Sequence, residues 1–356
     1  MKNSWRDLTS VYIGTIIGAG FASGQEIIQF FGVFGYKGII GIIFASLLFS
    51  VVGTIVLLQV YRNKLFCYTE YINLLLGNRA GRFFEIIVVS YLFIGYSIML
   101  AGSGAIFYEQ FNMSMNAGIY IMTLLCFLTL VFSVKGISFV NRLVVPLLIM
   151  GIVLVGSVVV IKEGFIFSNF YGANITKTGN WLTSSILYVS YNSISGIVML
   201  ASLFPIINNE KQAIKGGIMG GVGLGIMGLF ILLSTLILYT DIYNMEIPMI
   251  KASELLGSWG PIMYSTILWL AMFTTAIASG FGCINRVSML VGEGNFFISA
   301  VFCVFAVPFA KIGFSSLVST LYPLFGYLGL FMLIYIILNQ IVITININRR
   351  NLYRKK

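Results

Sequence analysis

Residues 16–30 read IIGAGFASGQEIIQF, an apolar segment that contains three glycines and a serine, followed by a glutamine and a glutamate. The segment lies within a mostly apolar stretch, 8–35, that is long enough to cross about 30 Å of hydrocarbon as a helix. In hydrocarbon an unsatisfied backbone group costs several kcal/mol, so a helix is interrupted only where its freed groups face protein, ligand or water. We therefore predict a membrane helix that is broken near Gly18 to Gly20 at a functional site.

The composition agrees with an integral membrane protein. Of the 356 residues, 59% are hydrophobic and 9% are charged, and apolar runs alternate with short polar stretches along the whole chain. That balance is typical of membrane proteins, and no segment has the polar composition of a soluble domain. We expect an all-α chain that forms a single membrane domain over residues 1–356 and is embedded in the lipid bilayer.

Apolar stretches of membrane-spanning length recur along the sequence. The expected spans are 8–35, 38–61, 83–109, 117–135, 137–161, 182–207, 211–239, 257–284, 293–311 and 314–344. An even count of ten places both termini on the same side of the membrane. With the N-terminus inside, the inner segments carry sixteen Lys and Arg residues and the outer segments five. The positive-inside rule then predicts that both termini are cytoplasmic.

The same charge distribution accounts for the net charge of +10. The basic residues lie in short loops and at the C-terminal end, which indicates membrane orientation and no binding of nucleic acid. The outer cations are Lys37, Lys162, Lys177, Lys251 and Lys311.

The spans repeat at a fixed offset. Moving the second to fifth spans along the chain by about 175 residues places them on the seventh to tenth, as expected for an internal repeat. The two halves, 1–161 and 182–344, each contain five spans. Because five is odd, the second half enters from the opposite side, which gives the inverted repeat of secondary transporters, with the substrate between the halves at mid-membrane.

The repeat makes the first and sixth spans equivalent, and both contain residues that disfavour a simple lipid-facing helix. The sixth span carries the polar run YVSYNSISG, 188–196. Small and polar residues also allow close helix packing, but their presence at matching positions favours two helices broken at mid-membrane. In the seventh span Gly217, Gly221 and Gly225 are spaced by four residues, which predicts a face for close helix packing and no ligand site.

A break near Gly18 would leave carbonyls unpaired behind it and amides unpaired ahead of it. The carbonyls of Gly14 and Ile17 could bind a cation, and the amides of Ala19 to Ala22 could bind a carboxylate. A dinucleotide motif is excluded, because Ser23 occupies the place of the third glycine of GxGxxG.

Several chemistries are disfavoured by composition. The chain has no histidine, which excludes a histidine metal cluster and a histidine-based catalytic triad. The cysteines show no CxxC spacing, so we expect no disulfide and no metal site. These cysteines are Cys67, Cys126, Cys283 and Cys303. Because the chain also lacks clustered carboxylates that could perform catalysis, we expect no enzymatic activity, and we expect no cofactor.

The string GTIIGAGFASGQE, the polar sixth span and NNEKQAIKGG at 208–217 together resemble the amino acid, polyamine and organocation (APC) superfamily with its LeuT-type fold of five plus five helices. The first of these strings is most similar to that of the YkvI-type bacterial membrane proteins. The resemblance implies sodium-coupled symport of an amino acid or a related small amine-bearing solute by alternating access, in the bacterial cytoplasmic membrane. A nutrient sensor on the same fold is the alternative.

The resemblance also implies a sodium site. The eighth span reads LAMFTTAIASG, 270–280, which is similar to the pattern that supplies one carbonyl and two hydroxyls in sodium-coupled members of the fold. Hydroxyls in membrane helices also bond back to the preceding turn, which is the alternative. Some proton-coupled relatives place a fifth-span lysine there, and 143–161 contains none, which favours sodium over a proton. The implied ligands are Gly14, Ile17, Ala271, Thr274 and Thr275.

The implied substrate site combines the first and sixth spans. The backbone around Gly18 to Ala22 would bind a carboxylate, and the sixth span would bind the amine and form the specificity pocket. Tyr96 in the third span either forms another wall or bonds to a neighbouring helix. The implied substrate-binding residues are Gly18, Ala19, Gly20, Phe21, Ala22, Tyr191, Asn192, Ser193, Ser195, Gly196 and Tyr96.

Glu26 is the acidic residue that lies well inside a span, and an intramembrane carboxylate indicates a functional site. It could carry a coupling proton, attract a cationic substrate or form an outer gate with Gln25. Ser23 and Glu26 also match the S-x-x-E capping box, in which both side chains would stabilise the start of a helix. The outer segment 240–257 either forms a short helix over the vestibule or a surface loop.

Overall fold

The computed structural model describes residues 5–132, 137–165, 176–291 and 295–354. The chain is helical, and its first half contains α1 (Trp5–Ile16), α2 (Ala19–Ala22), α3 (Gln25–Phe30), the 3-10 turn η1 (Gly32–Phe34), α4 (Tyr36–Asn63), α5 (Tyr68–Phe111), α6 (Met115–Phe132) and α7 (Ile137–Glu163). The second half contains α8 (Trp181–Leu200), η2 (Phe204–Ile206), α9 (Glu210–Ile237), α10 (Tyr239–Ile242), α11 (Pro248–Ala252), η3 (Ser253–Leu256), α12 (Gly260–Val291), α13 (Asn295–Ala310) and α14 (Phe314–Arg354).

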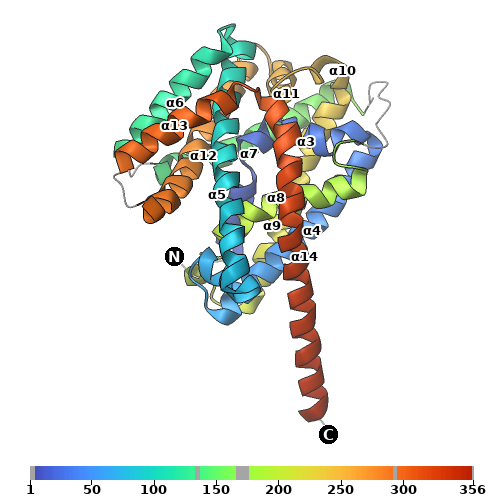
Figure 1. Cartoon of the computed structure of the whole chain (residues 1–356). Coiled ribbons are helices and arrows are strands. Elements are labelled where there is room, and N and C mark those ends of the chain that lie inside the picture. Colours follow the sequence, from blue (N-terminus) through green and yellow to red (C-terminus); the bar gives the residue numbers. More distant parts are fainter. Residues whose placement is uncertain (1–4, 133–136, 166–175, 292–294, 355–356) are drawn as a thin grey trace.

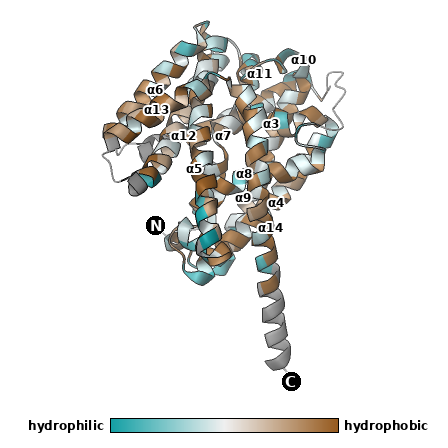
Figure 2. Ribbon diagram, in the orientation of Figure 1, coloured by the Kyte–Doolittle hydropathy of each residue, from teal (hydrophilic) through white to brown (hydrophobic). Residues whose placement is uncertain are grey.

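Among the described residues, seven helices are long and apolar enough to cross a membrane. These are α4, α5 from Arg79 onward, α6, α7 from Leu143 onward, α9, α12 as far as Val287 and α14 as far as Gln340. Helix α13 contributes a shorter apolar segment. Figure 2 shows hydrophobic residues along these helices and hydrophilic residues mainly at the loops. Large apolar side chains such as Phe83 and Val304 are exposed on the outside, as expected for a surface in contact with lipid.

The helices surround a central region. Figure 1 shows α5 and α14 side by side, with α14 extending past the body toward the C-terminus, while α6, α12 and α13 form a group to one side. Helix α8 packs against α14 and α4 on the other side of this centre. Helix α5 kinks at Gly77, where φ is 71°, so the short segment before the kink is separate from the long apolar helix that follows.

The predicted packing role of the seventh-span glycines is confirmed. Helix α9 packs along α4, the helix that the repeat makes its equivalent. A Cβ added at Gly217 or Gly221 would lie 2.6 Å from the Cα of Thr54 or Ser50, so the two backbones touch where the glycines lie. The Ser46 hydroxyl donates to the Gly221 carbonyl at 3.0 Å across this contact. Because glycine has no side chain, these positions allow both close packing of the two helices and hydrogen bonds between them.

The predicted break at 188–196 is wrong. Helix α8 is continuous from Trp181 to Leu200, and the chain leaves the helix only at Ala201 to Leu203. The serine and asparagine side chains of the run bond back to carbonyls of their own helix, as Ser190 does to Ile186 (2.7 Å) and Ser193 does to Val189 (2.7 Å). Because these groups are satisfied within the helix, polarity does not require unwinding here.

The outer segment 240–257 forms short helices, in agreement with the first of the two predicted alternatives. Helices α10 and α11 and the turn η3 cover most of it. The Met249 amide donates to the Ser23 carbonyl at 3.1 Å, which attaches this segment to the end of α2.

Candidate functional site

The first span is interrupted at the predicted place. Helix α1 ends at Ile16, Ile17 and Gly18 are not helical, and Gly18 is extended, with φ of −93° and ψ of −177°. The Gly18 amide donates to the Ile16 carbonyl at 2.8 Å, whereas an uninterrupted helix would direct it to Gly14. The first bond of α2 runs from the Ala22 amide to the Gly18 carbonyl at 3.1 Å. The break thus places end-of-helix carbonyls and start-of-helix amides within a few residues of each other.

A cavity of about 690 Å³ lies at this break. Helices α1, α2, α3, α5, α7, α8, α12 and α14 all contribute residues to its wall. It brings together most of the site residues predicted from sequence. Those that line it are Gly14, Ile17, Gly18, Ala19, Gly20, Glu26, Tyr191, Asn192, Ser195, Ala271, Thr274 and Thr275.

Other predicted residues lie elsewhere. Ser193 and Gly196 face a small gap beside Tyr12, because the continuous α8 turns them away from the face that carries Tyr191 and Ser195. Tyr96 bonds to a neighbouring helix, the second alternative, with its hydroxyl 3.2 Å from the Cys303 sulfur.

Three more predicted residues belong to the packing around the break. Phe21 is buried between α4 and α9, beside a second small gap. The Ala22 carbonyl accepts the Tyr264 hydroxyl at 2.6 Å. Gln25 is buried and donates through Nε2 to the Ser315 hydroxyl.

The wall also contains residues that sequence reasoning missed. They include Ser10, Thr15, Tyr91, Gly95, Ser279 and Tyr322. Ser279 follows Thr275 by four residues, so helical spacing could have placed it on the same face. Tyr91 and Tyr322 have no comparable local signal, because their position depends on how α5 and α14 pack.

The predicted sodium ligands all line the cavity. The Gly14 and Ile17 positions belong to the break, and Ala271, Thr274 and Thr275 belong to α12. The Thr274 hydroxyl also donates to the Ala271 carbonyl at 3.1 Å, which is the back-bonding alternative. Each of these two oxygens keeps a lone pair that could bind a cation while the hydrogen bond remains.

The capping-box interpretation of Glu26 is wrong. Gly24, with φ of 86°, precedes α3 and takes the N-cap position instead of Ser23. The Ser23 hydroxyl donates to the Gly20 carbonyl at 2.6 Å, and its amide donates to Ala19 at 2.9 Å. The Glu26 carboxylate therefore has no free Ser23 amide to bind. The Ser23 hydroxyl oxygen does accept the Gln25 amide at 3.2 Å, so the serine bonds to the start of α3, but the left-handed backbone at Gly24, which suits glycine, prevents the reciprocal arrangement of a capping box.

The Glu26 carboxylate instead turns back toward the break. It is 5% exposed, and its Oε2 accepts a hydrogen bond from the Tyr191 hydroxyl. A Cβ at Gly20 would collide with its Oε1, so the carboxylate lies directly against the Gly20 backbone. The Tyr191 ring stacks on Tyr322 with centroids 4.7 Å apart and on Phe30 with centroids 5.4 Å apart. An acidic group and an aromatic stack thus share the inner end of the cavity.

The cavity opens on the side where α1 begins. Ser10 and Ala278 are exposed at its wall, and Met199 is 40% exposed, whereas Glu26 and Tyr191 are buried at the opposite end. Beyond Glu26 the structure is closed by the bonds from Gln25 to Ser315, Met249 to Ser23 and Tyr264 to Ala22.

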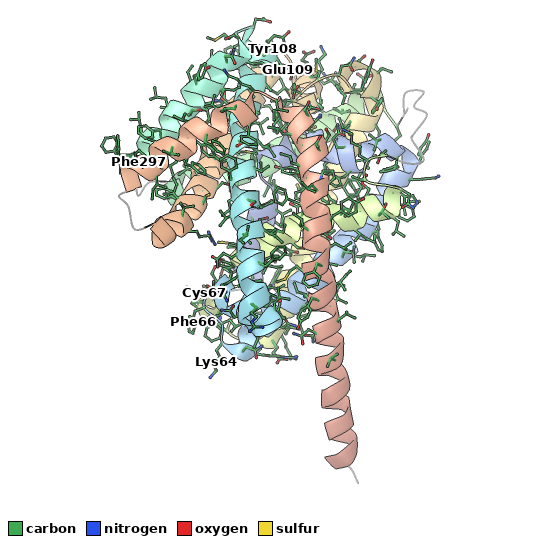
Figure 3. All side chains as sticks on the ribbon, viewed as in Figure 1. Lys64, Phe66, Cys67, Tyr108, Glu109 and Phe297 are labelled. Atoms are coloured by element: carbon green, nitrogen blue, oxygen red, sulfur yellow. The ribbon has the colours of Figure 1, made fainter. Side chains whose placement is uncertain are left out.

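The outer segment is held in place at this closed end. The Glu109 carboxylate, labelled at one end of the molecule in Figure 3, accepts the amides of Glu246 at 2.6 Å and Ile247 at 3.1 Å. The Glu246 carboxylate in turn accepts the Ser315 amide at 2.6 Å near the start of α14. Lys64 and Cys67 are labelled at the opposite end. The short outer helices, α5 and α14 therefore close the cavity together with α3.

Comparison with known proteins identifies the family. No family model matches the chain. It is 34% identical over 334 residues to the "Uncharacterized membrane protein YkvI" of Bacillus subtilis (strain 168), covering 92% of this chain and 94% of that protein. It is 27% identical to the "Uncharacterized protein YyaD" of the same organism, covering 93% and 95% of the two chains.

Solved structures with the same arrangement share little sequence. A variant of the Eremococcus coleocola manganese transporter gives a TM-score of 0.62 at 16% identity, over 93% of this chain and 79% of that one. The inward-facing conformation of Mhp1 gives 0.58 at 12% identity, over 92% and 75%. A Na+-coupled sialic acid symporter in its outward-open state gives 0.56 at 13% identity, over 92% and 78%. The chain belongs to the YkvI family of membrane proteins, and its fold is of the LeuT type.

Proposed function

We propose that the protein is a secondary active transporter that moves an amino acid or a related small amine-bearing solute by alternating access, with sodium as the coupling ion. The observation that supports this most is the cavity at the broken first span. It collects the predicted cation ligands and the solute-facing backbone in one place, opens on one side and is closed on the other. The named structural neighbours are transporters, which is consistent with this function.

We propose that the chain crosses the membrane ten times. Seven helices have the required length and hydropathy. The interrupted α1 to α3, the polar α8 and the short α13 would complete the set, in two inverted halves of five. The positive-inside rule supports cytoplasmic termini in the bacterial cytoplasmic membrane. The cavity would then open to the cytoplasm, since it opens where α1 begins.

Sodium would bind where α1 ends beside α12. Carbonyl and hydroxyl oxygens are the ligands that hard cations prefer. The Gly14 carbonyl has lost its helical partner at Gly18, and Thr274 and Thr275 line the same cavity. The bond from the Thr274 hydroxyl to the Ala271 carbonyl leaves a lone pair on each oxygen, so sodium could bind both without breaking it.

Proton coupling through Glu26 is the second candidate. Its support is the buried carboxylate at the break, hydrogen-bonded to Tyr191 on the opposite half of the protein. Protonation would weaken the attraction between Glu26 and a cation in the cavity, which is one way in which a proton gradient could drive a cycle.

The two couplings are separated by uptake into liposomes that contain the purified full chain. We expect an inward sodium gradient to stimulate uptake of a labelled amino acid or amine, and the double substitution Thr274→Ala with Thr275→Ala to remove that stimulation. Thr266→Ala is the matched control, because Thr266 lies on the same helix but is exposed and bonds back to Ile262 at 2.7 Å. Stimulation that survives the double substitution would exclude this sodium site.

A further inference from the structure

Glu26 occupies the place where a solute carboxylate was expected. The amides that follow the break were predicted to bind that carboxylate, yet Glu26 Oε1 lies directly against Gly20, in the middle of this segment. A solute carboxylate at the same amides would lie beside the carboxylate of Glu26. Two carboxylates that share a site repel each other strongly when water is excluded.

The rest of the cavity wall offers no positive side chain to offset this repulsion. Its described residues include one acid, Glu26, and no lysine or arginine. The ion pairs that Arg62, Lys251 and Arg286 form all lie elsewhere and do not include Glu26. The negative charge of Glu26 therefore favours binding of a cationic ligand and disfavours binding of an anionic group.

The surroundings of Glu26 also favour a positive charge. Tyr91, Tyr191 and Tyr322 line the same cavity, and aromatic rings attract cations through their negative faces. The Tyr191 hydroxyl already donates to Oε2, so its bond fixes the carboxylate and leaves Oε1 directed toward the break. The predicted sodium ligands belong to the end of the first half-helix and to α12, whereas this acid and aromatic cluster belongs to α3, α5, α8 and α14.

The size of the cavity indicates an organic ligand. A volume of about 690 Å³ lies within the range of small-molecule sites and is far larger than a single ion needs. Apolar residues such as Met99 and Leu148 line it beside the polar ones. A ligand with a charged head and an apolar body would match both parts of the wall.

We propose that the solute is a small organic monocation without a carboxylate, whose positive charge lies against Glu26 while its apolar part occupies the rest of the cavity. This inference rests on the proposed transport function and narrows its substrate class from amino acids and amines to amines alone.

The test compares ligands that differ only in the carboxylate. Isobutylamine is titrated against valine, and phenethylamine against phenylalanine, by calorimetry on the purified full chain in lipid nanodiscs. We expect each amine to bind at least about 10-fold more tightly than its parent amino acid, since like-charge repulsion disfavours the zwitterion. Glu26→Gln should weaken amine binding by about 30-fold or more, the lower end for removing one partner of a buried charge pair.

Two further variants check the assignment. Glu163→Gln removes an exposed acid at the end of α7 and should leave amine binding unchanged. Glu26→Asp keeps the charge and should retain the preference for amines. The preference of the unsubstituted protein needs no variant, so it decides the question even if Glu26→Gln fails to fold.

The outcomes separate this inference from the proposed function. Equal or tighter binding of valine and phenylalanine, or no binding of either amine, would overturn the inference. Sodium-stimulated uptake of valine under those conditions would still leave the transporter proposal standing. Amine binding that depends on Glu26, without uptake of any solute, would support the cation site and contradict transport.

Discussion

Substituting Gly221 by alanine should separate two helices that the fold requires to touch. A Cβ at this position would lie 2.6 Å from the Cα of Ser50, and a backbone atom cannot swing aside as a side chain can. The nearest backbone atom, the Ser50 nitrogen, would lie at 2.3 Å, so reaching the 3.4 Å of an ordinary contact requires α4 and α9 to move apart by about 1.1 Å. The movement would also strain the bonds from Ser46 to the Gly221 carbonyl (3.0 Å) and from Ser50 to the Ile218 carbonyl (3.2 Å).

The magnitude follows from three contributions. Overpacking costs about 1–3 kcal/mol, the two weakened interhelical hydrogen bonds cost about 0.6 kcal/mol each, and replacing a helical glycine by alanine returns about 1 kcal/mol. Gly221→Ala should therefore lower the free energy of unfolding by about 1–3 kcal/mol. Gly228→Ala on the same helix is the control, because its Cβ would meet only side-chain atoms, of Ile42 at 3.4 Å and of Ile27 at 3.9 Å. We expect that control to be neutral or stabilising by up to about 1 kcal/mol.

Equilibrium unfolding in mixed micelles, by titration with a denaturing detergent, measures both variants against the unsubstituted protein. If Gly221→Ala proved as stable as Gly228→Ala, the conclusion that α4 and α9 depend on backbone contact at the glycines would be refuted. An equal loss of stability in both variants would indicate that the effect does not depend on backbone contact with α4, and it would refute the same conclusion.

Three further predictions concern the cavity. Gly20→Ala should abolish solute binding, measured by calorimetry, because the new Cβ would displace the Glu26 carboxylate. Gly18→Ala should fold normally, because its Cβ meets nothing within 4 Å. Equal effects of the two substitutions would contradict the assignment of Glu26. Gln25→Ala should raise the labelling of the closed end by an impermeant reagent, since it removes the bond to Ser315, and unchanged labelling would show that this bond does not hold the gate. Ser10→Cys should react with an impermeant maleimide added from the side where α1 begins, and protection there would contradict the direction of the opening.

Seven of the ten expected spans correspond to described helices that are long and apolar enough to cross a membrane, and these were predictable because their signal is local. A segment in lipid must be continuously apolar, and the expected span 38–61 lies within α4, Tyr36–Asn63. The ends are less certain, because a helix continues past the membrane wherever its residues allow it. Helix α14 reaches Arg354, whereas hydropathy alone ended the last span at residue 344.

The break in α8 was predicted wrongly because polar side chains have two uses in a membrane helix. Serine and asparagine side chains can bind a ligand at a functional site, but they can also form their hydrogen bonds with backbone carbonyls of their own helix. Here Asn192 bonds back to Tyr188 at 3.1 Å and Ser195 to Asn192 at 3.0 Å. Composition is the same in both cases, and only the backbone geometry distinguishes them.

Glu26 shows where local pattern and long-range packing compete. The S-x-x-E pattern is compatible with a capping box, but Ser23 can act as the N-cap only if φ at Gly24 is helical. Glycine adopts positive and negative φ about equally readily, so the sequence does not predict this angle. The partner that the carboxylate does bind, Tyr191, lies 165 residues away. Such a pair is set by how the two halves of the protein pack together.

The unequal structures of the two central spans constrain how the site recognises its ligand. Helix α8 is intact, and the side chains of Asn192 and Ser195 already bond to their own helix, so they are less available to a solute. The interrupted span carries freed backbone groups near Gly18 and a carboxylate that returns to the same place. Under the proposed function, recognition of charge would therefore fall mainly on the first span, and α8 would contribute chiefly Tyr191, whose hydroxyl bonds to Glu26. Any movement of α3 relative to α8 would break the bond between Glu26 and Tyr191, so opening of the closed end and release of the charged group would occur together.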